Sequence, residues 1–185
     1  MLYKELKNLK LDLNPSFVLP VLESTKQYQI TPYTKEEVLG KSSLIQLFNL
    51  GLIWHVRQIQ VFTAIGNYEG DIHVDGTDSS TQEGAINWIC NETPDSNWST
   101  EWFNVKTDGN KIVTDQKKGP GSGILYKLEN CEIIESWNGP SSTPTLLHVG
   151  IPHRIVNRAN TIRQCISIRF HIETQDFHKL NSLLD

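Results

Sequence analysis

A histidine and an aspartate stand two positions apart in a short apolar run, at His73 and Asp75. If this run is an extended strand, side chains i and i+2 project from the same face, so the imidazole and the carboxylate point the same way. These are two of the three ligands in the two-histidine, one-carboxylate set that holds non-haem Fe(II) with coordination positions left open. So short a motif also recurs by chance, as a surface pair beside a turn. The prediction of a metal site therefore depends on a second histidine.

The second histidine is expected at His153, with His148 as the alternative. A three-residue hairpin loop at 158–160 would join a strand that begins at His153 to a strand that contains Arg163, and would pair His153 with Cys165. In that register an arginine lies two pairs along from the candidate ligand. The position ten residues after His148 falls in the loop instead, so His153 is preferred.

Arg163 is predicted to bind an anion inside the protein. The strand over 161–170 alternates, which places Arg163 on a face with small side chains. An unpaired buried charge is costly, so this guanidinium needs a partner. A dicarboxylate supplies one, because its far carboxylate can form a bidentate pair with arginine while its other end reaches the metal. The opposite, packed face is predicted to consist of Ile162, Ile166, Ile168 and Phe170.

Length and composition argue against several other classes of protein. The chain has 185 residues, which favours one domain with a sizeable core. Its formal charge is −4 without a block of like charge, so nucleic acid and membrane surfaces are not expected partners. The first residues lack the apolar run of a signal peptide, and a cytoplasmic location is expected. The three cysteines are odd in number and far apart, which is typical of reduced thiols.

The second half of the chain is rich in short apolar and β-branched runs separated by turn residues. Such runs at close spacing predict a sandwich, a jelly roll or a barrel. The runs are 52–65, 71–75, 84–90, 101–106, 111–115, 123–128, 131–137, 145–149, 153–157 and 161–172.

Helices are expected only at the two ends of the chain. Residues 1–50 are predicted to form a flank with one helix over 35–49, which a capping box of Thr34 and Glu37 would start. A short amphipathic helix is predicted over 174–184 with Thr174 as its cap.

The pattern His73-x-Asp75, then His153, then Arg163 ten residues later resembles the H-x-D…H…R pattern of Fe(II)- and 2-oxoglutarate-dependent oxygenases. The likeness extends over about residues 55–172. It is strongest to small stand-alone bacterial and phage members related to prolyl and aspartyl hydroxylases. The segments that carry it are 72–76, 84–88, 151–157 and 163–170.

This resemblance implies a fold, a site and an activity. The implied fold is a mainly β double-stranded β-helix, a cupin-like jelly roll over residues 52–172 with a few flanking helices, in a single domain of residues 1–185. The resemblance implies Fe(II) ligands at His73, Asp75 and His153, and Arg163 as the anchor for the distal carboxylate of 2-oxoglutarate. The implied activity is hydroxylation of a substrate C–H bond, coupled to oxidative decarboxylation of 2-oxoglutarate to succinate.

The chain departs from the family pattern in two places. The 77 residues between Asp75 and His153 are a long interval, which implies an insertion near 93–122. Cys165 stands where many relatives carry serine, and Asn87 is either a further contact to the co-substrate or a core residue. Four tryptophans are expected either to frame the pocket or to pack in the core, namely Trp88, Trp98, Trp102 and Trp137.

Three other classes of protein are weighed against the oxygenase. A cupin-like metal enzyme that works without 2-oxoglutarate would not require Arg163. A metal-free β-sandwich that binds a sugar or a protein through its tryptophans would not take up Fe(II), Mn(II) or Ni(II). A zinc hydrolase is disfavoured, because the additional acidic ligand and general base it usually needs have no evident place in this sequence.

Overall fold

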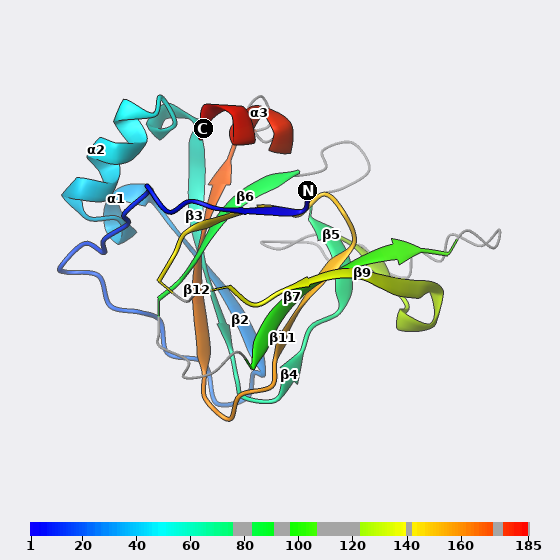
Figure 1. Cartoon of the computed structure of the whole chain (residues 1–185). Coiled ribbons are helices and arrows are strands. Elements are labelled where there is room, and N and C mark those ends of the chain that lie inside the picture. The colour runs from blue at the N-terminus through cyan, green and yellow to red at the C-terminus, as the bar shows by residue number, and fades with distance from the viewer. Residues whose placement is uncertain (76–82, 91–96, 107–122, 140–141, 172–175, 185) are drawn as a thin grey trace.

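The computed structural model describes residues 1–75, 83–90, 97–106, 123–139, 142–171 and 176–184. Two antiparallel sheets dominate it (Figure 1). In spatial order the major sheet contains β1 (Tyr3–Glu5), β10 (Thr145–His148), β6 (Gly84–Ile89), β12 (Arg163–Phe170), β3 (Val56–Ala64) and β2 (Tyr28–Tyr33). The minor sheet contains β8 (Gly123–Tyr126), β5 (Ile72–Asp75), β11 (His153–Asn157), β7 (Trp98–Val105) and β9 (Cys131–Trp137), and β4 (Tyr68–Glu69) also pairs with β11.

The order of the strands defines the fold class. Seven strands alternate between the sheets along the chain, with β3, β6, β10 and β12 in the major sheet and β5, β7 and β11 in the minor sheet, while β4, β8 and β9 are additional strands of the minor sheet. This winding is that of a double-stranded β-helix, and it confirms the predicted cupin-like jelly roll with a few helices. Because the two sheets face each other, alternate side chains of every strand point into the space between them.

The predicted hairpin between His153 and Cys165 is wrong. β11 lies in the minor sheet, where His153 pairs with His73 and Trp102, whereas Cys165 of β12 pairs with Phe62 and Ile89 in the major sheet. The intervening residues cross from one sheet to the other. At this crossing Asn157 donates from Nδ2 to two main-chain carbonyls, those of Ile65 (2.8 Å) and Thr161 (2.9 Å).

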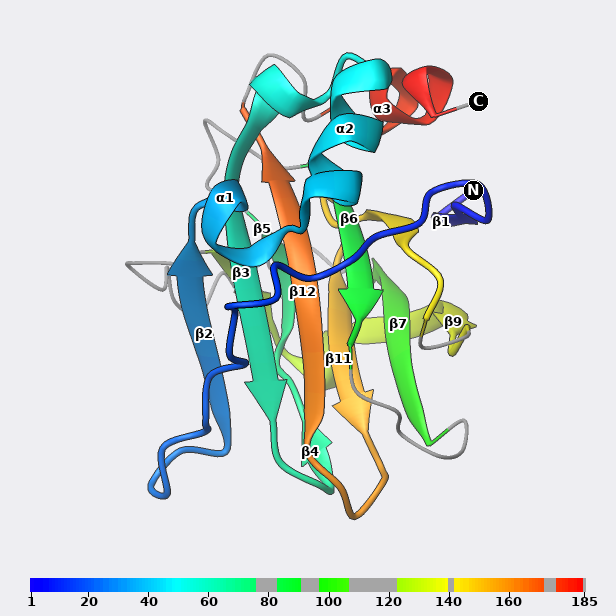
Figure 2. The same ribbon diagram turned by 90° about the vertical axis from the view of Figure 1, so that its left-hand side faces the viewer.

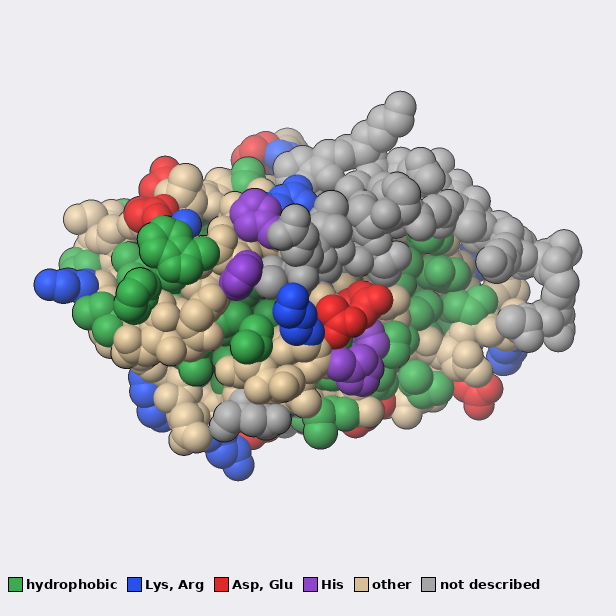
Figure 3. Space-filling model, turned by 90° about the horizontal axis from the view of Figure 1, so that it is seen from above, with side chains coloured by type: hydrophobic (Ala, Val, Ile, Leu, Met, Phe, Trp, Pro, Cys, Tyr) green, Lys and Arg blue, Asp and Glu red, His purple; other side chains and the backbone are tan. Residues whose placement is uncertain are grey.

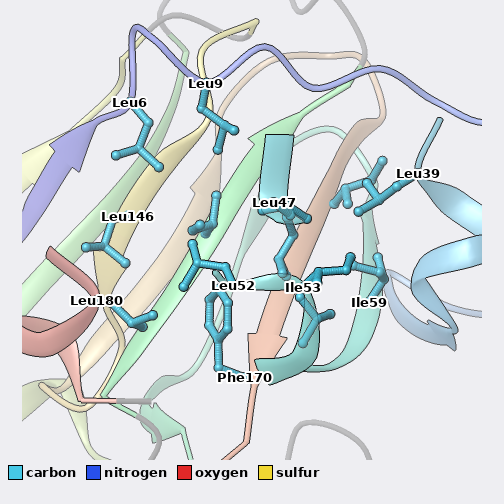
Figure 4. Close-up of a cluster of buried hydrophobic side chains, with 14 of the residues drawn as sticks. Leu6, Leu9, Leu39, Leu47, Leu52, Ile53, Ile59, Leu146, Phe170 and Leu180 are labelled. Carbon is cyan, nitrogen blue, oxygen red and sulfur yellow. The ribbon is translucent and has the colours of Figure 1, made fainter. Parts of the chain in front are cut away.

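The outer face of the major sheet is covered by helices α1 (Lys35–Val38), α2 (Lys41–Asn49) and α3 (Phe177–Leu183) and by the N-terminal segment (Figure 2). Figure 4 shows leucine and isoleucine side chains gathered with Phe170 in this layer. Ile166, Ile168 and Phe170 are buried here as predicted, whereas Ile162 is 46% exposed and lies outside the core. Ile162 precedes β12, so the strand does not hold it against the helices.

The predicted helix over 35–49 is interrupted at Leu39 and Gly40. Its start is as expected, since the side chains of Thr34 and Glu37 form a capping box. At the interruption the backbone pairs with residues 12–14 instead of continuing the helix, since the Gly40 amide donates to the Asp12 carbonyl (2.9 Å) and the Val38 carbonyl accepts from the Asn14 amide (2.8 Å). A Cβ atom on Gly40 would lie 2.3 Å from Asp12 Oδ2, so glycine suits this close approach. Gly40 caps α2 without a side chain of its own, and Asp12 Oδ1 instead accepts a hydrogen bond from the Ser43 amide (2.7 Å).

Two further expectations concern the remaining segments. Residues 98–105 of the expected insertion form β7, a strand of the minor sheet, and the rest of 93–122 lies outside the described residues except for 97 and 106. The C-terminal helix begins one residue after Asp176, whose side chain caps it, while Thr174 lies outside the described residues. The short 3-10 helices η1 (Ile53–His55) and η2 (Leu128–Asn130) precede β3 and β9. Within the described segments, none of the helices has the length and apolarity needed to cross a bilayer.

Candidate metal centre

The structure brings His73, Asp75 and His153 together on the inner face of the minor sheet. β5 and β11 are neighbours in that sheet, and His73 and His153 are direct partners in their register. The two imidazole centroids are 4.5 Å apart, with the ring planes at 44°. One ligand atom from each of the three residues lies within 4.8 Å of those of the other two, so the group can hold a metal ion.

Both imidazoles are oriented by a main-chain carbonyl. Nδ1 of His73 lies 2.8 Å from the carbonyl oxygen of Asp71, and Nδ1 of His153 lies 2.9 Å from that of Ile151. A carbonyl only accepts, so each Nδ1 carries the proton and donates it. When the rings are neutral, this arrangement leaves each Nε2 with a free lone pair, which is the form in which histidine binds a metal.

Asp75 is held between a histidine and an arginine. Its Oδ1 lies 3.3 Å from His73 Nε2, and its Oδ2 accepts a hydrogen bond from Nη1 of Arg169 on β12. Burial alone would raise the pKa of Asp75, but the charge of Arg169 and the hydrogen bond with His73 outweigh burial and keep this pKa far below its usual range. The carboxylate is therefore ionised, with Oδ1 on the side of the histidines.

The two histidines have different pKa values because only one is hydrogen-bonded to the acid. Burial, reinforced by the nearby His73, lowers the pKa of His153 to about 4, so this ring is neutral at physiological pH. Burial also disfavours the charged form of His73, but the hydrogen bond and charge of Asp75 outweigh it and raise the pKa of His73. A metal ion would displace the proton that His73 and Asp75 attract.

Arg169 was not predicted as part of the site. Its position follows from alternation along β12, because Arg163 and Arg169 are an even number of residues apart and share the inner face. The sequence therefore already indicated the position of Arg169, but the H-x-D…H…R pattern ends at Arg163.

Arg163 is also buried on this inner face. It is 2% exposed, and its guanidinium carbon lies 5.0 Å from the ring centroid of Trp98 on β7. The Nε atoms of Arg163 and Arg169 are both buried without a hydrogen-bond partner among the described residues. The inner-face positions between them hold the small side chains of Cys165 and Ser167. The inner face of β12 therefore offers unused donors at both ends of a stretch of small residues.

Other residues considered from the sequence lie away from the three-residue group or have structural partners. The ring of His148 stacks on Phe177 of α3, with centroids 4.7 Å apart, and is not part of the group with His73 and Asp75. Asn87 on β6 accepts a hydrogen bond from Ser167 and is 7% exposed.

The tryptophans of the middle section belong to the core. Trp98, Trp102 and Trp137 are at most 5% exposed and pack in the cluster between the sheets, whereas Trp88 packs against the helices. Trp102 is the register partner of His153, and its indole donates to the carbonyl of His148 (2.9 Å). Trp98 and Trp102 of β7 and Trp137 of β9 therefore pack between the sheets, on strands to one side of β11.

Seen from above, the molecule brings histidine side chains to the surface in more than one place (Figure 3). One of these places lies directly beside acidic and basic side chains.

Fold and side chains together define the class of this protein. It has a cupin-type jelly-roll fold, with a His–Asp–His group that can hold a metal ion. No protein family model and no curated protein sequence matches the chain.

Solved structures with a similar arrangement include a vicilin from Solanum melongena, which is 9% identical over 84% of this chain and 31% of its own, with a TM-score of 0.43. Another is ycfD of E. coli, which is 13% identical over 76% of this chain and 32% of its own, with a TM-score of 0.40. A third is dTDP-4-dehydrorhamnose 3,5-epimerase from Elizabethkingia anophelis, which is 12% identical over 87% of this chain and 75% of its own, with a TM-score of 0.34. The aligned part of this chain spans about a third of the length of the first two.

Proposed function

We propose that this protein is a non-haem Fe(II)- and 2-oxoglutarate-dependent oxygenase that hydroxylates a C–H bond of its substrate. The observation that carries the proposal is the combination of the His–Asp–His group with two buried arginines on the strand facing it. The metal group alone is equally compatible with other cupin-like enzymes. Because Arg169 is paired with Asp75, it is the buried Arg163 that favours a co-substrate with a carboxylate at its far end.

The three-residue group fits Fe(II) by its chemistry. Two neutral imidazoles and one carboxylate form a borderline-hard N/O donor set, which leaves coordination positions for other ligands. His73 and His153 both keep Nδ1 on a carbonyl, so Nε2 is the donor that each would present. Asp75 would present Oδ1, because Oδ2 is held by Arg169. When bound, the iron would supply oxygen activation coupled to oxidative decarboxylation of 2-oxoglutarate.

The arginines fit a dicarboxylate for electrostatic reasons. Arg163 is almost completely buried, and its Nε lacks a hydrogen-bond partner in the described segments. Taking a guanidinium out of water costs several kcal/mol, which a charge-assisted pair with a carboxylate would offset in part. Arg163 would therefore anchor the distal carboxylate of 2-oxoglutarate. Cys165 and Ser167, the two inner-face residues between Arg163 and Arg169 on β12, have small side chains.

One contact favours a second candidate, a metal-free binding module. Arg169 already neutralises Asp75, so the acid is satisfied without a metal ion. This candidate leaves the buried Arg163 unexplained, and it predicts no uptake of divalent transition metals.

Calorimetry with Mn(II) as a redox-stable substitute for Fe(II) tests the proposal. We expect Mn(II) to bind the wild-type protein and 2-oxoglutarate to bind only when Mn(II) is present. Arg163→Met should weaken the binding of 2-oxoglutarate by about 10-fold or more while Mn(II) still binds, since a charge-assisted hydrogen bond contributes roughly 1.5–3 kcal/mol. Arg57→Met, a change of an exposed arginine, is the matched control. Equal 2-oxoglutarate affinity in the two variants would contradict the assignment.

A further inference from the structure

A cluster of buried charges lies on the face of the minor sheet opposite to the histidines. Glu101 of β7 is 4% exposed and Arg154 of β11 is 9% exposed, and the two are direct partners in the register. Because side chains alternate along a strand, Arg154 points to the opposite side from its neighbour His153. The proposed chemistry uses neither residue.

The cluster connects β11 to the strands on both of its sides. Arg154 Nε donates to Glu101 Oε2 (2.8 Å), and Arg154 Nη1 donates to Glu69 Oε2 on β4 (3.1 Å). Glu101 Oε1 accepts from Arg158 Nη2 (3.1 Å) and from Ser99 Oγ (3.3 Å). Burial alone would raise the pKa of Glu101, but the two arginines outweigh it and lower this pKa. We call Glu69, Glu101, Arg154 and Arg158 the charge cluster.

Stability alone is a poor explanation for these charges. Removing two ions from water is costly, and apolar residues of similar volume are often equally stable or more stable at such positions. The best-supported use of a buried polar contact is to fix one register among alternatives. A slip of one residue in β11 would turn His153 outward and Arg154 inward, away from Glu101.

The backbone pairing of β11 leaves room for such a role. The two strands that carry the histidines share a single register pair, His153 with His73. β11 has five pairs with β7 and two with β4. The position of His153 relative to His73 is thus set mainly by strands that carry no ligand, and Arg154 binds an acid on each of them.

We propose that Glu101, Arg154 and Glu69 are positioning residues, which hold β11 in the register that places the His153 ring beside the His73 ring. The expected change in metal affinity rests on the proposed function. The expected change in the distance between the two rings does not depend on any metal.

The test is a double variant, Glu101→Met/Arg154→Leu, which removes both buried charges and leaves no buried ion unpaired. Glu69 and Arg158 have half-exposed side chains and become solvated. The matched control is Glu23→Met/Lys26→Leu, which removes an exposed ion pair (2.8 Å) of the same charges. Each protein is measured without metal by thermal unfolding and by the nuclear Overhauser effect between the imidazoles of His73 and His153, and then by calorimetry with Mn(II).

We expect the double variant to unfold at or above the wild-type temperature, to lose the Overhauser effect between the rings and to bind Mn(II) about 10-fold or more weakly. The control should match the wild type in all three measurements. Glu101→Gln, which keeps the side-chain shape, should also weaken the Overhauser effect between the rings and lower the affinity for Mn(II).

An unchanged Overhauser effect in the double variant would overturn the inference. A wild-type protein that shows the Overhauser effect between the rings but binds no Mn(II) would instead contradict the proposed function. In that case the Overhauser effect in the double variant would still test whether the charge cluster positions His153.

Discussion

At the scale of single residues, the candidate site depends on how each side chain is held. The two imidazoles are oriented by carbonyls of the residues two positions before them, and the acid is oriented by Arg169. These contacts fix which atom each residue offers. They also identify Arg169 as the residue whose replacement gives the most informative change.

Replacing Arg169 with methionine should weaken metal binding. Without the guanidinium, the buried Asp75 loses the charge that keeps it ionised, and its Oδ2 loses its hydrogen-bond donor. We expect the Kd for Mn(II), measured by electron paramagnetic resonance, to rise about 10-fold, in the range seen when residues that orient ligands are removed. Arg169→Lys, which keeps the charge, should recover part of the affinity. An unchanged Kd in Arg169→Met would show that Asp75 needs no such support.

How much of the site could be predicted differs from residue to residue. The alternation of side chains in a strand is sufficient to place His73 beside Asp75, and the structure brings both to His153. It could also have placed Arg169 with Arg163. The contact between the Arg163 guanidinium and Trp98 could not be predicted from one strand, because Trp98 comes from the opposite sheet.

At the scale of elements, capping and sheet crossing explain where the sequence-based expectations and the structure differ. The amphipathic spacing of residues 35–49 predicted one helix, but residues 38–40 form backbone hydrogen bonds with residues 12–14 in place of helical ones. The predicted hairpin was wrong because local turn chemistry does not reveal that β11 and β12 have better partners in different sheets. Both errors come from contacts between residues that are distant in the sequence.

The cap that Asp12 provides for α2 gives a prediction of stability. Asp12→Ala should lower the free energy of unfolding by about 1 kcal/mol, the usual value of an N-terminal cap. For a chain of this size the unfolding temperature should fall by roughly 2–4 °C. Asp12→Asn keeps an acceptor for the Ser43 amide and should lose less. Equal loss in the two variants, measured by calorimetry, would show that the carboxylate charge matters more than the cap.

The contact between β10 and α3 predicts a pH dependence. Burial lowers the pKa of His148 below its usual value of 6.5, and the nearby His178 and the N-terminus add to this shift. The folded protein therefore binds fewer protons at His148 than the unfolded chain does. Its contribution to stability is complete above pH 6.5 and is lost as the pH falls through 6.5 toward the lower folded-state pKa.

Thermal unfolding at about pH 7.5 and about pH 5.5 checks this dependence. His148→Phe preserves a ring that can stack on Phe177 but cannot take up a proton. We expect the unfolding temperature of the wild type to fall more between the two pH values than that of the variant. An equal fall in the wild type and in His148→Phe would contradict this dependence.

At the scale of the whole molecule, the N-terminal segment is part of the major sheet. β1 and β2 form its two outer edges, and β12, which carries Arg163 and Arg169, lies between them. We propose that residues 1–185 fold as one domain. Thermal unfolding should then show one transition, with coincident near- and far-ultraviolet circular dichroism. Two separated transitions would indicate that the N-terminal segment and the jelly roll unfold independently.

Metal binding should stabilise the whole molecule, because the ligands come from two strands and are assembled only in the folded state. At a Mn(II) concentration of about 100 times the Kd, the expected gain is about 2.7 kcal/mol. A gain of this size raises the unfolding temperature by roughly 5–10 °C. A chelator should reverse the shift, and His153→Ala should not show it. A similar shift in that variant would place the metal elsewhere on the protein.

The central claim is that His73, Asp75 and His153 hold Fe(II) while Arg163 anchors 2-oxoglutarate beside it. The most direct test is the visible absorption spectrum of the protein with Fe(II) and 2-oxoglutarate in the absence of oxygen. We predict a metal-to-ligand charge-transfer band in the wild type, a band that requires a higher 2-oxoglutarate concentration in Arg163→Ala, and no band in His153→Ala. A band that is unchanged in both variants, or absent from the wild-type protein, would contradict the claim.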